Sequence, residues 1–449
     1  MAIQKKTLPD YKIAQVGLGY VGLPAACLFA DAGFDVIGID IDEDRVKRIN
    51  KGFNPIKGRE PGMDALVKKV TKSKKLVATT DVAKLQDRDI ILVTVQTPVE
   101  DDHLPRYEHM RSALKTVAQN MKKGALIIIE STIAPTTMEK VIRPAIEDEN
   151  GYELNKDYML ANCPERVMPG RLIYNLTHYD RLVGAYSEKA GLIVRKLYEK
   201  VLGIKVDITD PLTAEIVKSG ENTYRDVQIA FANEMALLCE AYGANVWEVR
   251  DLINKCPYRA MHMPGAGVGG HCIPKDSWLL ISGAREAIET KMIPLARKIN
   301  DFMPRHMFDL LKMAVKESGK ELEKIKVVVL GFAYDANSDD TRMTPTEPLM
   351  KILTKHQVEY VIQDPYVLEY KEPIEKALKG AYAVILMTAH DEYKKIKLEK
   401  LKKILKGTHP ARNALHSMAG RPILIDGRNM WDKAAAQKLG FIYKGVGNI

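Results

Sequence analysis

Residues 13–40, IAQVGLGYVGLPAACLFADAGFDVIGID, decide the fold. The apolar run 13–16 is followed at once by a glycine turn, Gly17-Leu18-Gly19-Tyr20-Val21-Gly22, and then by alanine-rich sequence suited to a helix. A second apolar run, 34–39, ends at Asp40. A strand, a glycine turn, a helix and a second strand in this order predict a dinucleotide-binding βαβ unit, a context that turns a weak motif into a strong one.

Each glycine of the turn has a separate task. Gly17 allows the tight turn, Gly19 lets a pyrophosphate approach the N–H groups at the start of the helix, and Gly22 lets helix and strand pack closely. A carboxylate at Asp40 accepts hydrogen bonds from ribose hydroxyls and repels a ribose phosphate, which predicts NAD as the cofactor. Arg45 could hold a phosphate, neutralise Asp40 or lie against the adenine. A purely structural glycine turn, or another nucleotide, is the competing interpretation.

Short β-branched runs alternate with helical patterns through the first 210 residues. The runs are 13–16, 34–40, 90–95, 126–130, 158–161 and 205–208. Strands that alternate with helices predict a parallel, doubly wound sheet, and ligands of such sheets bind beyond the carboxyl ends of the strands. Chemistry is therefore expected at 96–98, 131–132 and 164–166, although ordinary strand-end turns would give the same pattern.

The rest of the chain begins with helical sequence. One long helix is predicted over 211–244, and more helical patterning follows on both sides of a glycine-rich loop, resuming over 275–317. A second alternating series begins with a strand at Lys326 and continues with strands at 360–363, 383–387 and 423–426. Its first strand runs into Gly331-Phe332-Ala333-Tyr334, which does not support a second dinucleotide site of the same kind.

These patterns predict an α/β protein with two Rossmann-like, doubly wound domains joined by a central helical region with a long connecting helix. The predicted domains are 1–210 for NAD, 211–318 for the helical, dimer-forming region, and 319–449 for the second α/β domain. A homodimer formed through the long helix is expected.

The net charge of +9, from 67 Lys+Arg against 58 Asp+Glu, would suit nucleic acid, a membrane surface or an anionic small substrate. The densest basic stretch, 394–406, reads KKIKLEKLKKILK, with apolar residues at helical spacing and no interleaved aromatic residues. That pattern is typical of a surface helix and disfavours a nucleic-acid site.

The five cysteines form no CxxC pair and are too sparse for a disulfide framework, so no metal site is predicted and a reducing compartment is expected. Residues 1–11 lack the apolar core of a signal peptide, and no apolar run approaches the roughly 20 residues that span a bilayer. A cytoplasmic protein without a membrane partner is expected.

The stretch 264–276, PGAGVGGHCIPKD, is the most unusual in the chain. Its four glycines would let the backbone come close to a ligand. Cys272, followed by Lys275 and Asp276, could act as a nucleophile if positive charge stabilised its thiolate. A buried structural cysteine is the alternative. Lys218 and Asn222 share one face of the predicted long helix and could hold an oxyanion, unless that face is simply solvated.

Five motifs in the same order resemble the nucleotide-sugar 6-dehydrogenases, the UDP-glucose and GDP-mannose dehydrogenase family, over essentially the whole chain. They are GLGYVGLP (17–24), QTP (96–98), CPERVMPG (163–170), EIVKSGEN (215–222) and GAGVGGHCIPKD (265–276). The resemblance implies a four-electron oxidation of a sugar C6 alcohol to a carboxylate, with two NAD consumed.

The resemblance also implies catalytic roles. Cys272 would add to the aldehyde as a thiohemiacetal, which a second hydride transfer converts to a thioester. Lys218 and Asn222 would stabilise the oxyanions, while Asp276 would position Lys218 or a water molecule. Glu165 and Thr132 would orient the water that hydrolyses the thioester.

Binding residues follow from the same resemblance. Cofactor contacts are expected at Gly17, Gly19, Tyr20, Val21, Gly22, Asp40, Arg45, Thr97, Thr132, Lys275 and Arg342. Substrate contacts are expected at Glu165, Arg166, Val167, Lys218, Asn222, Gly269 and Tyr334, and at Arg259, which would reach across the dimer interface. The second α/β domain would hold the uridine diphosphate of a UDP-sugar.

The forms Pro-Glu-Arg-Val-x-Pro-Gly and Gly-Gly-His-Cys-Ile-Pro most resemble members of the family that oxidise UDP-N-acetylmannosamine. Pro169 stands where UDP-glucose enzymes usually carry a second glutamate. UDP-N-acetylglucosamine and UDP-glucose are the alternative substrates. Asp335 stands where the family usually has a lysine, and Arg342-Met343-Thr344-Pro345 replaces Arg-Glu-Ser-Pro. A non-catalytic, NAD-sensing protein that retained the fold is the alternative from a different class.

Overall fold

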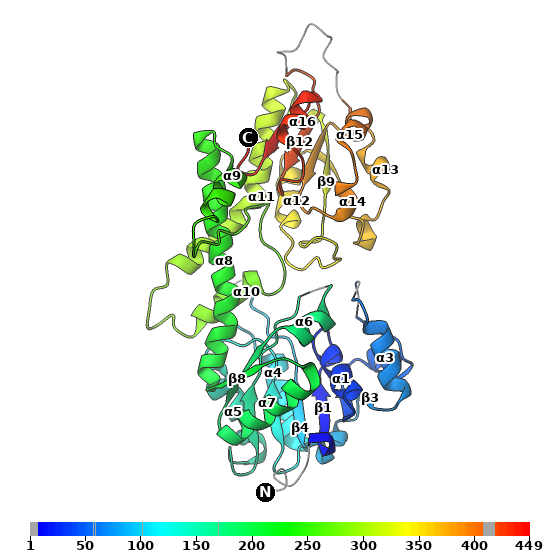
Figure 1. Cartoon of the computed structure of the whole chain (residues 1–449), viewed down its shortest axis with the longest axis vertical. Helices are drawn as coiled ribbons and strands as arrows, with labels where there is room; N and C mark the ends of the chain where they lie inside the picture. The colour runs from blue at the N-terminus through cyan, green and yellow to red at the C-terminus, as the bar shows by residue number, and fades with distance from the viewer. Residues whose placement is uncertain (1–7, 57, 59, 101, 169, 407–417) are drawn as a thin grey trace. The chain divides into compact units, whose positions relative to one another are not determined.

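The computed structural model describes residues 8–56, 58, 60–100, 102–168, 170–406 and 418–449 (Figure 1). Contacts divide the chain into two compact units: unit 1 runs to Glu221 and includes Lys275–Glu289, while unit 2 contains Asn222–Pro274 and Thr290–Ile449. The predicted central helical region is shared between the two units, and the three-domain division stays a prediction.

Unit 1 is built on an eight-stranded sheet in the order β3-β2-β1-β4-β5-β6-β7-β8. All neighbours pair in parallel except β6 and β7, which are antiparallel. The order reverses between β1 and β4, the switch point at which doubly wound sheets bind their ligands. The strands are β1 Lys12–Val16, β2 Asp35–Ile39, β3 Leu76–Thr79, β4 Ile90–Val93, β5 Leu126–Ile129, β6 Met159–Asn162, β7 Arg181–Ala185 and β8 Val206–Thr209.

Both faces of this sheet are covered, which explains the continuous apolar runs of its central strands. Ile90 and Leu92 enter one core, and the alternate residues Ile91 and Val93 enter the other. The helices of unit 1 are α1 Gly22–Asp31, α2 Glu43–Asn50, α3 Met63–Lys72, α4 Glu108–Asn120, α5 Arg143–Asn150, α6 Leu172–His178 and α7 Glu188–Leu202, with shorter turns η2 Leu8–Asp10, η3 Val82–Asp87 and the π-helical η4 Met138–Ile142.

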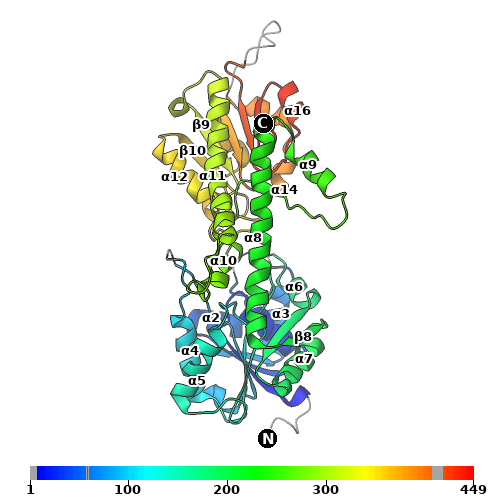
Figure 2. The ribbon, with the colours of Figure 1, turned by 90° about the vertical axis from the view of Figure 1, so that its left-hand side faces the viewer.

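The predicted long helix is present as α8, Pro211–Tyr242, which Figure 2 shows as one unbroken element. The helices that follow are α9 Val246–Ile253, α10 Ile273–Ser282 and α11 Met292–Glu317. The helical patterning predicted over 275–317 corresponds to two helices, because 283–291 is not helical. Gly283 follows the last residue of α10, and Pro294 lies in the first turn of α11, where its missing N–H has no helical acceptor to lose.

Unit 2 has a five-stranded, wholly parallel sheet in the order β10-β9-β11-β12-β13. Its switch point lies between β9 and β11. The strands are β9 Lys326–Leu330, β10 Glu359–Gln363, β11 Ala383–Leu386, β12 Ile423–Asp426 and β13 Ile442–Gly445. The helices are α12 Thr346–Lys355, α13 Ile374–Leu378, α14 Asp391–Lys394, α15 Leu398–Ile404 and α16 Lys433–Lys438, with short turns η5 Leu322–Lys324 and η6 Leu368–Tyr370.

The predicted α/β class, with two doubly wound sheets and a long helix, is confirmed. The sequence prediction missed β3, β7 and β13, and it took 394–406 as one helix. The structure instead ends α14 at Lys394 and confines the basic helix to α15, in which Leu401 is buried. β7 and β13 each contain a basic residue and a glycine, which interrupt the apolar pattern.

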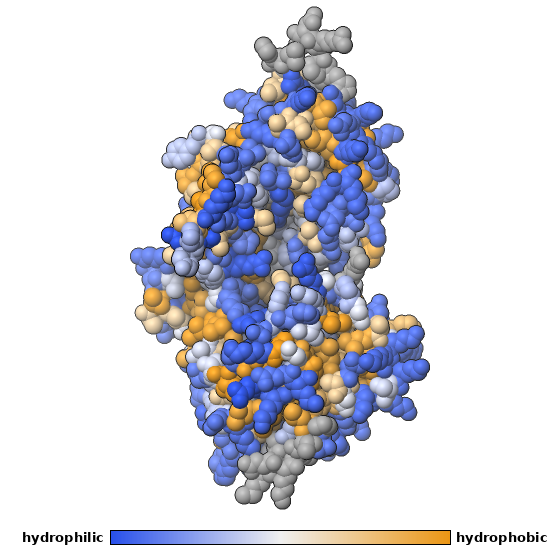
Figure 3. Space-filling model, viewed as in Figure 1, coloured by the Kyte–Doolittle hydropathy of each residue, from blue (hydrophilic) through white to orange (hydrophobic). Residues whose placement is uncertain are grey.

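No described helix has the combination of length and hydropathy that crossing a membrane requires. Hydrophilic side chains cover much of the face shown in Figure 3. The described residues also contain no group of three or more His, Cys, Asp or Glu side chains arranged to hold a metal ion.

Candidate active site

The glycine turn between β1 and α1 is forced by close backbone contact. Gly17 has φ of +87°, and a Cβ there would lie 2.1 Å from the carbonyl oxygen of Thr94. A Cβ on Gly22 would lie 2.0 Å from the carbonyl oxygen of Gly17. A Cβ on Gly19 would meet none of the described atoms within 4 Å. The turn therefore leaves open space beside Gly19 at the start of α1, which fits a pyrophosphate approaching the backbone.

Asp40 is fixed at the carboxyl end of β2. Its Oδ2 accepts the N–H of Leu18 at 2.7 Å, and its Oδ1 accepts the N–H of Asp42 at 3.0 Å. Nη1 of Arg45 lies 2.9 Å from both carboxylate oxygens. Of the alternatives for Arg45 that the sequence left open, the structure shows the one in which it pairs with Asp40.

The loops that follow β4 and β5 meet at the carboxyl edge of the unit 1 sheet. The hydroxyl of Thr97 donates to the carbonyl oxygen of Thr132 at 2.6 Å, and that of Ser131 donates to the carbonyl oxygen of Val95 at 2.7 Å. Thr97 is buried. The structure thus brings together two strand-end segments that the sequence singled out separately.

Glu165 follows β6 and is buried. Burial raises its pKa to about 7, although the positive charges of Arg181 and Lys218 oppose that rise. Its Oε1 has no hydrogen-bond partner among the described residues, and the N–H of Val167 donates to the carboxylate. Glu165 is therefore a carboxyl group that can hold or release a proton near neutral pH, and the positive charge of Lys218 on α8 favours its ionised form.

A buried network that the sequence analysis missed accompanies Glu165. The Tyr198 hydroxyl donates to Oε1 of Glu130 at 2.7 Å, and Nη1 of Arg181 lies 3.4 Å from the same oxygen. The guanidinium of Arg181 also lies over the Tyr198 ring, 5.1 Å from its centre. Glu130 could have been noticed as a carboxylate that closes an apolar strand run, but nothing in the sequence named its partners.

Two other charged residues of unit 1 have partners in this structure. Nε of Arg166 donates to Oε2 of Glu221 at 3.1 Å. Nζ of Lys275 lies 2.9 Å from Oδ1 of Asp276, and both side chains are buried.

Tyr20, in the glycine turn, donates its hydroxyl to Glu60, whose carboxylate also accepts the N–H of Gly170 at 2.6 Å. Pro169 lies outside the described residues.

In unit 2 the glycine-rich loop packs against the loop after β9. A Cβ on Gly269 would lie 2.5 Å from the Cβ of Tyr334, and one on Gly270 would lie 2.8 Å from the Tyr334 ring. A Cβ on Gly267 would lie 2.7 Å from Pro345, and the N–H of Gly270 donates to the carbonyl oxygen of Arg342 at 2.9 Å. These glycines therefore make room for the protein's own side chains. The expected approach of the loop to a ligand stays a prediction.

Cys272, at the end of this loop, is exposed. The alternative of a buried structural cysteine is therefore wrong. The ion pair with Asp340 and, to a smaller extent, the Cys272 thiolate raise the pKa of Arg342. By contrast, burial raises the pKa of the Cys27 thiol to about 12 and that of Cys163 to about 11. Cys272 thus combines exposure with a neighbouring cation, the setting of a reactive thiol.

The remaining predicted residues of unit 2 are placed as follows. Asn222 lies one helical turn after Lys218 on α8. Arg259 is exposed and donates to the carbonyl oxygen of Pro257 at 3.3 Å. Asp335 is exposed. Burial lowers the pKa of Arg428, and the negative charge of Asp335 acts in the opposite direction and raises it. Asp335, which stands where the family usually has a lysine, therefore interacts with Arg428, a residue that the sequence analysis did not single out.

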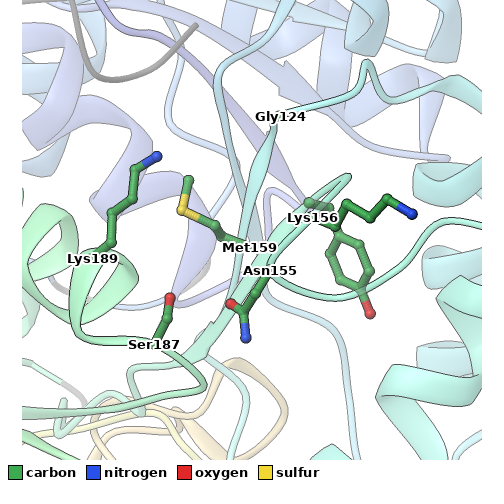
Figure 4. Close-up of a pocket in the computed structure, with 7 residues that line it drawn as sticks. Gly124, Asn155, Lys156, Met159, Ser187 and Lys189 are labelled. Atoms are coloured by element: carbon green, nitrogen blue, oxygen red, sulfur yellow. The ribbon is translucent and has the colours of Figure 1, made fainter. Parts of the chain in front are cut away.

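A pocket of about 170 Å³ lies elsewhere in unit 1 (Figure 4). Lys189 lies on one side of it and Lys156 on the other, with Ser187 and Asn155 between them. Met159 is the first residue of β6, and Gly124 precedes β5, so the pocket lies at the amino ends of these strands. It is therefore at the opposite edge of the sheet from the glycine turn and the strand-end residues.

Three family models match consecutive parts of the chain. They are the NAD binding domain (11–202), the central domain (212–302) and the UDP binding domain (328–433) of the UDP-glucose/GDP-mannose dehydrogenase family. The chain belongs to this family. It is an NAD-dependent oxidoreductase, and the cofactor predicted from the glycine turn and Asp40 is confirmed.

Named relatives and solved structures match nearly the whole chain. The UDP-N-acetyl-D-mannosamine dehydrogenase of Pyrococcus horikoshii is 40% identical, with 97% of this chain and 99% of the relative covered. A solved structure of UDP-D-ManNAc dehydrogenase from Pyrococcus horikoshii superposes with a TM-score of 0.89 at 39% identity, with 97% and 99% covered. An NDP-N-acetyl-D-galactosaminuronic acid dehydrogenase from Methanosarcina mazei superposes with a TM-score of 0.85 at 36% identity, with 98% and 95% covered.

Proposed function

We propose that the chain oxidises the C6 hydroxyl of UDP-N-acetylmannosamine to a carboxylate, with two NAD consumed for each sugar. The observation that carries the reaction type is the exposed Cys272, held by a glycine loop beside Arg342. The sugar is supported by relatives of full length, at 34–40% identity, that bear the name UDP-N-acetyl-D-mannosamine dehydrogenase. UDP-N-acetylglucosamine and UDP-glucose remain the alternatives within the class.

NAD supplies the hydride acceptor in both oxidations. In the first, the C6 hydroxyl loses a proton and a hydride and becomes an aldehyde. The Cys272 thiolate then forms a C–S bond to C6, and Lys218 and Asn222 stabilise the resulting oxyanion. Loss of a second hydride from C6 gives a thioester. Attack of water breaks the C–S bond, releases the carboxylate and restores the thiol.

Glu165 is the base that we assign to the hydrolytic step. A carboxyl group with a pKa of about 7 is substantially ionised at neutral pH and still basic enough to accept a proton from water. Thr132, whose carbonyl oxygen accepts a hydrogen bond from the Thr97 hydroxyl, would orient that water. Asp276, which lies beside the ammonium of Lys275, would position Lys218 or a water molecule.

The cofactor would occupy the carboxyl edge of the unit 1 sheet. Gly17, Gly19, Tyr20, Val21 and Gly22 would surround the diphosphate at the start of α1. Asp40 would accept the ribose hydroxyls with Arg45 beside it, and Thr97 and Thr132 would face the nicotinamide. Lys275 and Arg342 would lie near the diphosphate or the nicotinamide of the cofactor.

The uridine diphosphate would bind unit 2, where the UDP binding domain of the family is matched. Gly331, with φ of +94°, packs on Thr388 at the switch point between β9 and β11. Tyr334 follows in the same loop, so it reaches the edge at which such sheets bind ligands. Arg166, Val167, Arg259 and Gly269 complete the proposed substrate contacts.

A homodimer through α8 is also proposed. Tyr224, Phe231 and Leu238 are exposed and recur every seven residues, so they form one apolar stripe. Leu295 and Phe302 repeat the spacing on α11 and are also exposed. Stripes of this kind cost free energy in water and mark interaction surfaces. None of the five cysteines forms a disulfide, which fits the reducing cytoplasm that we propose as the location.

The substrate prediction is tested by the yield of NADH from a limiting sugar. UDP-N-acetylmannosamine, UDP-N-acetylglucosamine and UDP-glucose are each titrated to completion with excess NAD, and two NADH per sugar are expected from the first. The variant Cys272→Ala should give no more than one, whereas Cys256→Ala, the matched control at another exposed cysteine, should still give two. NAD binding with no NADH from any sugar would favour the NAD-sensing alternative.

The proposed base predicts a pH dependence. Because Glu165 acts as a base only when ionised, the rate of thioester hydrolysis should rise with pH through about 7 and level off above it. Glu165→Gln should remove this step and slow hydrolysis about 100-fold. Burial also raises the pKa of Glu215 to about 7, but that carboxylate accepts the N–H groups of Thr136 and Met138. A pH step that disappeared in Glu215→Gln and persisted in Glu165→Gln would refute the assignment.

The dimer prediction is tested with Phe231→Glu, which places a charge in the middle of the α8 stripe. Light scattering after gel filtration should show a monomer at micromolar concentration, while the wild-type chain elutes as a dimer. Leu368→Glu is the matched control, because Leu368 is exposed on η6, outside the α8 and α11 stripes. A wild-type monomer, or an unchanged dimer in Phe231→Glu, would contradict the proposal.

A further inference from the structure

A chain of buried polar side chains crosses the packed helices of unit 2 and ends at the loop that carries Cys272. Nη1 of Arg297 donates to Oδ1 of Asp226 at 2.6 Å, and Nδ2 of Asn300 donates to the same oxygen at 2.7 Å. Nδ2 of Asn233 donates to Oδ1 of Asn300 at 2.8 Å. The N–H of Gly265 donates to Oδ1 of Asn233 at 2.9 Å. The chain thus joins α11 and α8 to Gly265, near the start of the loop.

The donors in this chain all point toward Asp226. The peptide N–H of Gly265 can only donate, so Asn233 must present its oxygen to Gly265 and its amide nitrogen to Asn300. Asn300 must then accept through its oxygen and donate to Asp226, whose charge closes the chain. Each hydrogen bond polarises the next, and low local dielectric strengthens the series. The amide orientations are therefore set by the loop at one end and the carboxylate at the other.

Stability alone does not account for these residues. Asp226, Asn233 and Asn300 have no exposed surface, and Arg297 is 2% exposed. Met303 and Met307 of α11 and Ala232 and Ala236 of α8 supply an apolar core beside them. Replacing a buried polar cluster by well-packed apolar side chains is often neutral or stabilising. What an apolar replacement could not supply is an acceptor for the Gly265 N–H.

Gly265 is also confined from the other side. A Cβ on Gly265 would lie 2.6 Å from Nη1 of Arg428, and Ala266, the next residue, is fully buried against Gly427. The loop is thus held at its start by Asn233 and near its end by the contacts of Gly269 and Gly270 with Tyr334. Between these two anchors the glycines offer little stiffness of their own.

We propose that Asn233 and Asn300 are positioning residues for the oxidation, because they fix the start of the glycine loop and thereby the reach of Cys272 toward the aldehyde. This inference rests on the proposed function, in which Cys272 captures the aldehyde before it leaves. A displacement of about 1 Å can reduce the rate of a step about 100-fold. Slower capture gives the aldehyde time to escape, so loosening the anchor changes the product as well as the rate.

The test uses Asn233→Leu, a change of similar size that removes both hydrogen bonds of the side chain. NADH per UDP-N-acetylmannosamine is measured with the full-length protein, and released aldehyde is trapped with a hydrazine reagent. We expect the ratio to fall from two toward one, with aldehyde trapped in matching amount, kcat at least tenfold lower, and the Kd for NAD within twofold of wild type. Asn300→Ala, which leaves Asn233 in place, should shift the ratio in the same direction by less.

A matched control separates positioning from simple loss of stability. Leu311→Ala truncates a fully buried side chain of α11 that belongs to the apolar core and supplies none of the hydrogen bonds of the polar chain. It should lower the midpoint of thermal unfolding and still give two NADH per sugar, because each folded molecule keeps its anchor. If Asn233→Leu fails to fold, Asn300→Ala carries the test.

The outcomes are distinct. A wild-type ratio below two would overturn the proposed function itself. A wild-type ratio of two that persists in Asn233→Leu and Asn300→Ala, with no trapped aldehyde, would overturn the positioning role and leave the proposed function intact.

Discussion

A Cβ atom at Gly22 would lie 2.0 Å from the carbonyl oxygen of Gly17, and this contact governs how α1 meets the sheet of unit 1. With glycine at both positions the helix starts directly at the switch point, and its first N–H groups stay available to an anion. Asp40 can then reach the N–H of Leu18, which fixes its carboxylate beside the same turn. The cofactor site is therefore a consequence of backbone packing.

Close packing also requires glycines in unit 2, where they shape the loop that carries Cys272. Gly267, Gly269 and Gly270 let the loop lie against Pro345 and Tyr334, and the thiol that follows remains exposed. Differences in burial and in neighbouring charge distinguish two of the cysteines, and two of the glutamates, from each other. Cys163 has a pKa raised to about 11 by burial, whereas Cys272 lies near Arg342. Glu165 keeps an oxygen without a described partner, whereas both oxygens of Glu215 accept backbone N–H groups.

Sequence periodicity was sufficient for the fold class and the central strands, because strands buried on both faces read as apolar runs. It failed at β7, where Arg181 begins a short strand and Gly184 interrupts it. It also did not mark the break at 283–291, where helical composition continues. Motifs named Cys272 and Glu165, but not whether either is buried. Arg181, Asn233 and Arg428 were missed because each acts through a partner distant in the chain, which a one-dimensional pattern does not reveal.

The central claim is that the sugar becomes covalently attached to Cys272 during the second oxidation. It is tested most directly by mass spectrometry of Glu165→Gln, mixed with NAD and UDP-N-acetylmannosamine and quenched in acid within one turnover. The account predicts a peptide containing Cys272 that carries the sugar as its C6 acyl thioester and that loses it with hydroxylamine. Formation of two NADH without any adduct, or an adduct at Cys256 in place of Cys272, would contradict it.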